Sequence, residues 1–261
     1  MSQSEYLFGD NDLAAQRLQL LAHVYQESTR AFLENAAGSE SFQLALDLGC
    51  GPGFTTHLIA DTLRCDRVIG LDASAGFIEL ASANSDERLS FLQHDITAVP
   101  FSTGRANLIF SRFLLTHLRD AAAVVARWAT QLKSRGLLLL EETETIHTVH
   151  PAFERYLAIV EAMLASQSSQ LYAGRLIAGL DSPGGLKCTF SELRSIPVRN
   201  CDAARMFALS LNTWKGSEFV RTNYSSGFIL ELENDLVEIA AIESPAREIE
   251  WEMRQSEWLK E

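Results

Sequence analysis

The stretch Leu46-Asp47-Leu48-Gly49-Cys50-Gly51-Pro52-Gly53 decides how this sequence folds. It ends an apolar run over 44–48 that is typical of a strand, and it precedes a helical pattern over 54–63. Glycine has no Cβ, so glycines at every second position let the backbone turn sharply and approach a ligand closely. The helix that follows presents unpaired backbone amides at its N-terminus. The stretch therefore predicts a ligand-binding loop between a strand and a helix.

Acidic residues around this loop narrow the class of ligand. Asp72 lies nineteen residues after Gly53, at the end of a second apolar run, where a carboxylate can accept both hydroxyls of a ribose. Dinucleotide-binding enzymes need a third glycine at the position that Phe54 holds here. Asp47 lies two residues before the first glycine, and a carboxylate there suits an ammonium or a sulfonium better than a pyrophosphate. A dehydrogenase is therefore the weakest interpretation.

The remainder of the chain predicts an α/β protein followed by added helices. We expect strands over 44–48, 67–71, 89–93, 106–111 and 136–141, alternating with helices over 54–63, 75–83 and 121–132. This alternation indicates a parallel sheet with helices on both faces. Beyond Thr143 we expect a long helix over 151–170, a helix that Asp202 caps and that ends at Trp214, shorter helices over 217–226 and 229–242, and a late strand over 249–259.

Further motifs follow the loop in order. They are Asp72, Gln93-His94-Asp95-Ile96, Phe110-Ser111-Arg112-Phe113-Leu114-Leu115-Thr116-His117-Leu118, and Leu132-Lys133-Ser134-Arg135-Gly136 before an apolar strand. With the loop, they resemble the motifs of class I S-adenosylmethionine-dependent methyltransferases over residues 44–142. The resemblance implies a Rossmann-like, seven-stranded, mostly parallel sheet, with one antiparallel strand near 249–259. It also implies S-adenosyl-L-methionine as cofactor and a small-molecule methyl acceptor.

The same resemblance implies roles for individual residues. Asp95 is expected at the adenine amino group, Ile96 beside the adenine ring, and the residues at the end of the fourth strand beside the methionine part. The expected cofactor-binding residues are Asp47, Gly49, Gly51, Gly53, Asp72, Ala73, Asp95, Ile96, Ser111 and Arg112.

Catalytic residues are harder to predict from the sequence than cofactor contacts. Methyl transfer from a sulfonium depends largely on alignment and exclusion of water. A base is needed only if the acceptor must lose a proton early. Glu142, His117 and His147 are the candidates, and each is also explained as a packing or surface residue. His147 and His150 have no carboxylate partner at suitable spacing, so we expect no metal site. The expected acceptor-pocket residues, which are equally explained as core, are Tyr25, Arg30, Tyr156, Tyr172, Asn212 and Trp214.

These patterns divide the chain into an N-terminal helical lid over 1–38 and a methyltransferase domain over 39–261. Helical insertions around 147–185 and 202–242 are expected to build the substrate pocket, and residues 6–25 to fold over the cofactor. Two alternatives stay open. One is an enzyme that uses bound S-adenosylmethionine in a cyclisation or rearrangement without methyl transfer, and the other is a non-catalytic cofactor-binding protein.

Composition limits the partners. The net charge of −12 without a cluster of Lys and Arg disfavours nucleic acid and anionic membrane surfaces. The N-terminus lacks the pattern of a signal peptide, and no apolar run is long enough to span a bilayer. The four cysteines show no metal-type or disulfide-type spacing. We therefore expect a cytoplasmic monomer or homodimer with reduced thiols.

Overall fold

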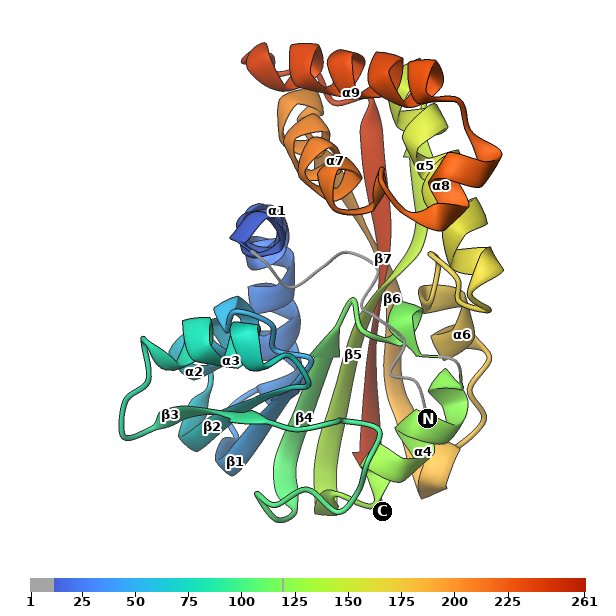
Figure 1. Cartoon of the computed structure of the whole chain (residues 1–261). Coiled ribbons are helices and arrows are strands. Elements are labelled where there is room, and N and C mark those ends of the chain that lie inside the picture. Colours follow the sequence, from blue (N-terminus) through green and yellow to red (C-terminus); the bar gives the residue numbers. More distant parts are fainter. Residues whose placement is uncertain (1–11, 119) are drawn as a thin grey trace.

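The computed structural model describes residues 12–118 and 120–261 and contains a seven-stranded sheet in the order β3-β2-β1-β4-β5-β7-β6 (Figure 1). Neighbouring strands from β3 to β5 pair in parallel, whereas β7 pairs antiparallel with both β5 and β6. The predicted fold class and the antiparallel last strand are confirmed. The strands are β1 (Ser41–Leu48), β2 (Arg64–Asp72), β3 (Leu89–Gln93), β4 (Ala106–Arg112), β5 (Leu132–Thr148), β6 (Leu186–Val198) and β7 (Ile249–Lys260).

Helices cover both faces of the sheet and its upper end (Figure 1). Successive residues of β1 point into different cores. Leu46 packs with α4 on one face of the sheet, and Ala45 packs with α1 and α2 on the other. Burial on both faces explains the nearly continuous apolar runs of the central strands. The helices are α1 (Asp12–Ala37), α2 (Phe54–Thr62), α3 (Ala75–Ser82), α4 (Ala121–Ala129), α5 (Pro151–Ser166), α6 (Gly174–Ala178), α7 (Asn200–Trp214), α8 (Glu218–Asn223) and α9 (Ser226–Ala241), with 3-10 turns η1 (Leu115–His117) and η2 (Pro183–Gly185).

Strands β5, β6 and β7 extend beyond the other strands and carry a second core. β5 continues to Thr148, whereas its neighbour β4 ends at Arg112. On one face of the extension, Ile146 and Trp251 pack with helices α5, α7 and α9, which we call the cap (Figure 1). The cap therefore stands over the carboxyl ends of the shorter parallel strands, where open α/β sheets bind ligands.

Three boundaries differ from the predictions. β5 is longer than expected, because its continuation pairs with β7 rather than ending at the sheet edge. β6 was not predicted: most of its side chains are exposed, so it lacks the alternation that marks a half-buried strand. Asp202 was wrongly expected to cap α7. The helix begins at Asn200, and Asp202 lies in its first turn, where Arg199 donates to its carboxylate at 2.7 Å.

The expected N-terminal helix is present as α1, and residues 1–11 of the lid expected over 1–38 lie outside the described residues. No helix in the described part of the chain is long and apolar enough to cross a membrane.

Candidate cofactor and acceptor site

The glycine loop is held by the backbone of β2. The amides of Gly49 and Cys50 donate to the carbonyl of Leu71 at 2.8 and 3.1 Å. Gly51 has φ of +52°, a conformation that side chains rarely adopt. Among the described residues, a Cβ on Gly51 would meet Leu18 of α1, at 3.4 Å, and no other atom within 4 Å. The loop is thus pinned to the sheet while its middle glycine leaves an open cradle beneath α1.

Asp72 connects this cradle to the next loop. Its Oδ2 accepts a hydrogen bond from the Gly51 amide at 2.9 Å, and its Oδ1 accepts one from the Ser74 amide at 2.9 Å. The Ser74 side chain in turn caps α3. Asp72 thus fixes the relative positions of the glycine loop and the loop after β2. Ala73 follows directly, and its carbonyl accepts a hydrogen bond from Gln93.

The loop after β3 lies beside the loop after β2, because the His94 amide donates to the Asp72 carbonyl at 2.8 Å. Asp95 is exposed, and its Oδ1 accepts hydrogen bonds from the amide and hydroxyl of Thr97. Ile96 is buried, and its carbonyl accepts a hydrogen bond from Trp128. The structure therefore brings Asp72, Asp95 and Ile96 to the same edge of the sheet as the glycine loop.

Asp47 and Arg112 lie on the face of the sheet that α1 covers. Thr56 of α2 donates to Asp47 Oδ2 at 2.7 Å, and burial raises the pKa of Asp47 to about 6. Arg112 lies close enough for its charge to oppose this rise. Arg112 Nη1 donates to the Thr29 hydroxyl of α1 at 2.9 Å.

Glu141 completes this buried network, although sequence analysis did not select it. Thr29 donates to Glu141 Oε2, and Gln255 of β7 donates to Oε1, each at 2.6 Å. Burial raises the pKa of Glu141, and the nearby Arg112 opposes the rise. The network ties α1, β4, β5 and β7 together below the cap. The sequence signal that was available is a pair of acidic residues closing an apolar strand.

Ser111 lies at the carboxyl end of β4, opposite Leu48 of β1. It is fully buried, and its hydroxyl has no hydrogen-bond partner among the described residues. Buried polar atoms are nearly always paired in proteins. An unpaired hydroxyl near an open glycine cradle and an accepting carboxylate fits a site built for a polar nucleoside ligand.

Glu142 points to the face opposite Glu141, since successive side chains of a strand alternate. Its Oε1 accepts hydrogen bonds from the amides of Leu114 and Leu115 at 2.7 and 2.8 Å, which fixes the start of η1. Its Oε2 is buried without a partner among the described residues, and burial raises the pKa of Glu142 to about 8. Glu142 therefore shapes the segment after β4 and is largely protonated at neutral pH.

His117 ends η1 and faces groups from two helices. Burial, and then the charge of Arg17 on α1, lower the pKa of His117 to about 3. Arg17 also lowers the pKa of Tyr156 on α5, whose burial raises it. His117 is thus a neutral imidazole where α1, η1 and the cap approach one another.

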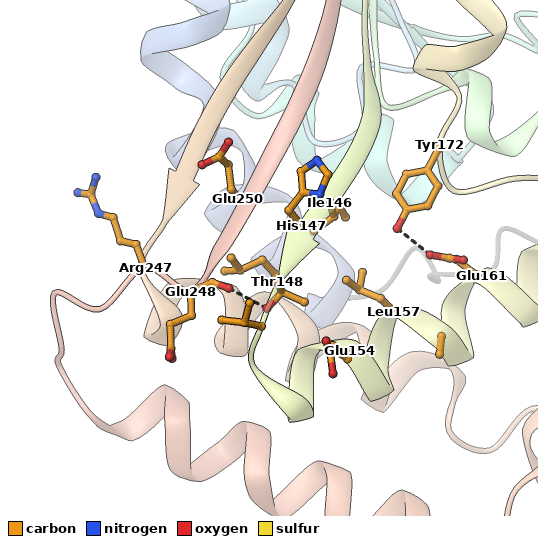
Figure 2. Close-up of a pocket in the computed structure, with 13 residues that line it drawn as sticks. Ile146, His147, Thr148, Glu154, Leu157, Glu161, Tyr172, Arg247, Glu248 and Glu250 are labelled. Atoms are coloured by element: carbon orange, nitrogen blue, oxygen red, sulfur yellow. Dashed lines mark hydrogen bonds between the residues drawn. The ribbon is translucent and has the colours of Figure 1, made fainter.

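His147 lies elsewhere, in a groove of about 670 Å³ between β5 and α5 (Figure 2). It is five residues beyond Glu142 along β5, which is about 15 Å of strand. Its Nε2 lies 3.4 Å from Glu252. Tyr172 lines the same groove and donates to Glu161 at 2.7 Å (Figure 2). The structure does not bring His147 or Tyr172 together with the glycine loop.

The other expected pocket residues divide into two groups. Tyr25 contacts the site, since its ring packs edge-on against Phe113, with centroids 5.0 Å apart. Tyr156 and Trp214 lie in the cap core, and Tyr156 stacks on Phe207. Arg30 and Asn212 bond elsewhere: Arg30 donates to Thr62 of α2, and Asn212 donates to the backbone of its own helix. Within the described ranges, no group of three or more potential metal ligands is placed to hold a metal ion.

Residues 46–140 match the family model of a methyltransferase domain. This part of the chain is similar to the methyltransferase domains that the model describes. A trans-aconitate 2-methyltransferase of Methylobacterium radiotolerans is 34 % identical over 138 residues, which is 52 % of each chain. A malonyl-(acyl-carrier protein) O-methyltransferase of Hahella chejuensis is 28 % identical over 111 residues, covering 41 % of this chain and 40 % of that protein. The chain thus spans about half or less of the curated relatives that it matches.

Solved structures share the methyltransferase fold over more of the chain. Phosphoethanolamine N-methyltransferase 2 of Haemonchus contortus, with S-adenosylhomocysteine, aligns with a TM-score of 0.57 and 16 % identity, over 97 % of this chain and 60 % of that one. A cyclase of the 4+2 type aligns with a TM-score of 0.55 and 14 % identity, over 90 % of this chain and 80 % of that one. At these identities the likeness concerns the fold alone.

Proposed function

We propose that this chain binds S-adenosylmethionine at the glycine loop and transfers its methyl group to a small-molecule acceptor. The observation that carries the proposal is the open cradle at Gly51 with the Asp72 carboxylate fixed beside it. Ribose hydroxyls would donate to Asp72, and the backbone of the loop would approach the nucleoside without a Cβ between them.

We assign the other cofactor contacts to residues at the carboxyl ends of the parallel strands. Asp95 would accept from the adenine amino group, and Ile96 would pack on the ring. Ser111 would pair its buried hydroxyl with the methionyl part. Asp47 and Arg112 carry opposite charges on the same face of the sheet, which suits the ammonium and carboxylate of an amino acid. Gly49 and Gly53 fix the loop, and Ala73 lies at its rim.

Bound S-adenosylmethionine supplies a methyl group on a sulfonium, which is already activated toward a nucleophile. In the transfer, the acceptor's lone pair forms a bond to the methyl carbon as the carbon–sulfur bond breaks, leaving S-adenosylhomocysteine. The chain aligns the two molecules and excludes water, with α1 as a lid and the cap over the acceptor. We propose His117 rather than His147 as the histidine that touches the acceptor, because it is neutral and follows β4, whose end lies beside β1 and the glycine loop. Glu142 acts by holding η1.

The experiment is a turnover assay with S-adenosylmethionine and a small-molecule extract. Release of S-adenosylhomocysteine together with a product heavier by one methyl group supports the proposal. Saturable S-adenosylmethionine binding with product formation but no S-adenosylhomocysteine would indicate a cyclisation or rearrangement. Absence of saturable binding would reject the cofactor itself.

The class of acceptor, the location and the oligomeric state are part of the same proposal. The names of the curated relatives support a small acceptor, and the acidic chain, at −12, disfavours nucleic acid. A cytoplasmic monomer or homodimer is consistent with these features, and size-exclusion chromatography with light scattering measures the oligomeric state.

A further inference from the structure

Strand β6 forms an open edge of the sheet. It is the last strand in the order of the sheet, and β7 is its only neighbouring strand in the part of the chain that the structure describes (Figure 1). The outer side of an edge strand presents backbone N–H and C=O groups that can pair with another chain. Proteins often keep such edges short, as in β3 with 5 residues, but β6 has 13. Consecutive side chains of β6 are exposed, so neither face of this strand is covered.

The regular part of β6 is bounded on both sides at equal distance from Leu193. Residues 190–196 pair with β7 without interruption. On one side, Thr189 is the extra residue at a shift in the register with β7. On the other side, Pro197 has no N–H with which to continue a ladder. Thr189 and Pro197 each lie four residues from Leu193, so a strand that pairs antiparallel with its own copy about Leu193 meets both interruptions at the same place.

The charges of this segment select the same centre. Glu192 and Arg194 flank Leu193, are exposed, and have no ion-pair partner among the described residues. In a continuous antiparallel sheet, residues opposite each other point to the same face, so a two-fold axis between identical strands passes through a residue. An axis at Leu193 places Glu192 opposite Arg194 of the second copy, twice. An axis at Glu192 or at Arg194 would place like charges opposite each other, which is destabilising.

The apolar side chains match in this register as well. Phe190 lies opposite Ile196 of the second copy, and Leu193 lies opposite its own equivalent, with 46 % of its surface exposed in the single chain. Phe190 already stacks on Phe32 of α1, with ring centroids 6.1 Å apart, and Ile196 packs against the core of the cap. Both side chains are therefore held in place before association, which lowers the entropy that pairing would cost.

We propose that two copies of this chain associate through β6, antiparallel about a two-fold axis at Leu193, and form one continuous sheet. The same patch serves both copies, as in the isologous interfaces of most homodimers. Three strands separate β6 from β1, so the glycine loop is not part of this interface. The proposal selects the homodimer and holds whether or not the chain transfers methyl groups.

Charge reversal with rescue is the first test, read by sedimentation velocity and light scattering. We expect wild type to have twice the monomer mass. Arg194→Glu and Glu192→Arg each replace two attractive pairs by two repulsive ones, and each should raise the dimer dissociation constant about 10-fold. The double variant, Glu192→Arg with Arg194→Glu, restores both pairs and should associate like wild type. Arg105→Glu is the matched control, because Arg105 is exposed outside β6 and undergoes the same change of charge.

Disulfide trapping is the second test, and it reads the register. Leu193→Cys, made with Cys188→Ser, should form a cross-linked dimer on oxidation, because the two cysteines lie opposite each other. Ser191→Cys in the same background should not cross-link. In the proposed register its two cysteines lie four residues apart along the strands, which is about 13 Å, whereas a disulfide needs Cα atoms within about 7 Å.

Three results would each overturn the proposal. One is a monomeric mass of wild type at the highest concentration that stays soluble, which would leave β6 to the strand of another protein or to solvent. Another is a dimer whose dissociation constant is the same in Arg194→Glu as in Arg105→Glu. The last is cross-linking of Ser191→Cys without cross-linking of Leu193→Cys, which would show a different register. Circular dichroism of each variant verifies that it is folded, and the rescue in the double variant separates lost association from a damaged strand.

Discussion

The carboxylate of Asp72 accepts a hydrogen bond from the amide of Gly51 at 2.9 Å. One side chain thereby joins the end of β2 to the middle of the glycine loop, twenty-one residues earlier in the chain. The acid that would receive the ribose also sets the shape of the loop that would receive the rest of the nucleoside. A change at either residue should therefore alter cofactor binding.

Asp72→Asn tests the acid. Asn keeps one accepting oxygen but places an NH₂ group toward either the Gly51 or the Ser74 amide, where two donors would face each other. We expect the Kd for S-adenosylhomocysteine to rise about 10- to 100-fold, as measured by calorimetry. Asp66→Asn is the control, since Asp66 is exposed near the other end of β2. Equal affinities of the two variants would contradict the assigned role.

Gly51→Ala tests the cradle. Gly51 and Gly104 have φ of +52° and +79°, so alanine should cost each variant about 1 kcal/mol of unfolding free energy. In the part of the chain that the structure describes, a Cβ on Gly104 meets no atom within 4 Å, whereas one on Gly51 enters the space under Leu18. Urea denaturation should show similar losses of stability, while only Gly51→Ala should lose affinity for S-adenosylhomocysteine. A comparable loss of affinity in Gly104→Ala would show that strain alone is responsible.

Glu142→Gln tests how the buried carboxyl makes the unfolding free energy depend on pH. Burial raises the pKa of Glu142 from 4.5 to about 8, so the folded protein holds this proton more tightly than the unfolded chain. The stability that the protonated Glu142 carboxyl gives to the folded protein is fully present below pH 4.5 and is lost as the pH rises to about 8. Gln keeps an acceptor for Leu114 and Leu115 but does not titrate. Between pH 5 and pH 9, the variant should gain about 2–4 kcal/mol of unfolding free energy relative to wild type.

Urea denaturation across this pH range measures the gain. Glu154→Gln is the control, because Glu154 is exposed near the start of α5 and should follow the wild-type curve. Parallel curves for Glu142→Gln and wild type would show that the carboxyl titrates normally in the folded protein.

Thr29→Val tests the connection between α1 and the sheet. The variant keeps the shape of the side chain but leaves Glu141 Oε2 without its donor and Arg112 Nη1 without its acceptor. We expect a loss of about 1–3 kcal/mol of unfolding free energy. Thr29→Ser retains the hydroxyl and should lose clearly less. If the two variants are equally stable, the hydroxyl makes no contribution, and packing of the methyl group is what matters.

Much of the sheet could be predicted because its signals are local. The loop from Leu46 to Gly53, the acid at Asp72 and the apolar strands each depend on neighbours along the chain, and the structure places them as expected. The late strand was also found, since Ile249, Trp251 and Met253 alternate with polar residues and point into one core.

Other features depended on contacts that a local pattern does not contain. β6 pairs with β7 while exposing most of its side chains, so its strand state comes from backbone pairing rather than from a buried face. His147 was selected with Glu142, but the continuation of β5 carries it into a separate groove.

The sequence by itself determined the elements at the sheet edge: a glycine loop, an acid at the end of the second strand and the succession of the parallel strands along the chain. Only the tertiary structure decided which side chains face the cleft. Glu141 and Glu142 are adjacent, yet one joins α1 through Thr29 and the other holds η1. Arg17 likewise resembles a surface cation in the sequence, but it is buried in the folded chain. The physical reason is that alternation and helical spacing fix relative faces, whereas long-range packing selects the face that is buried.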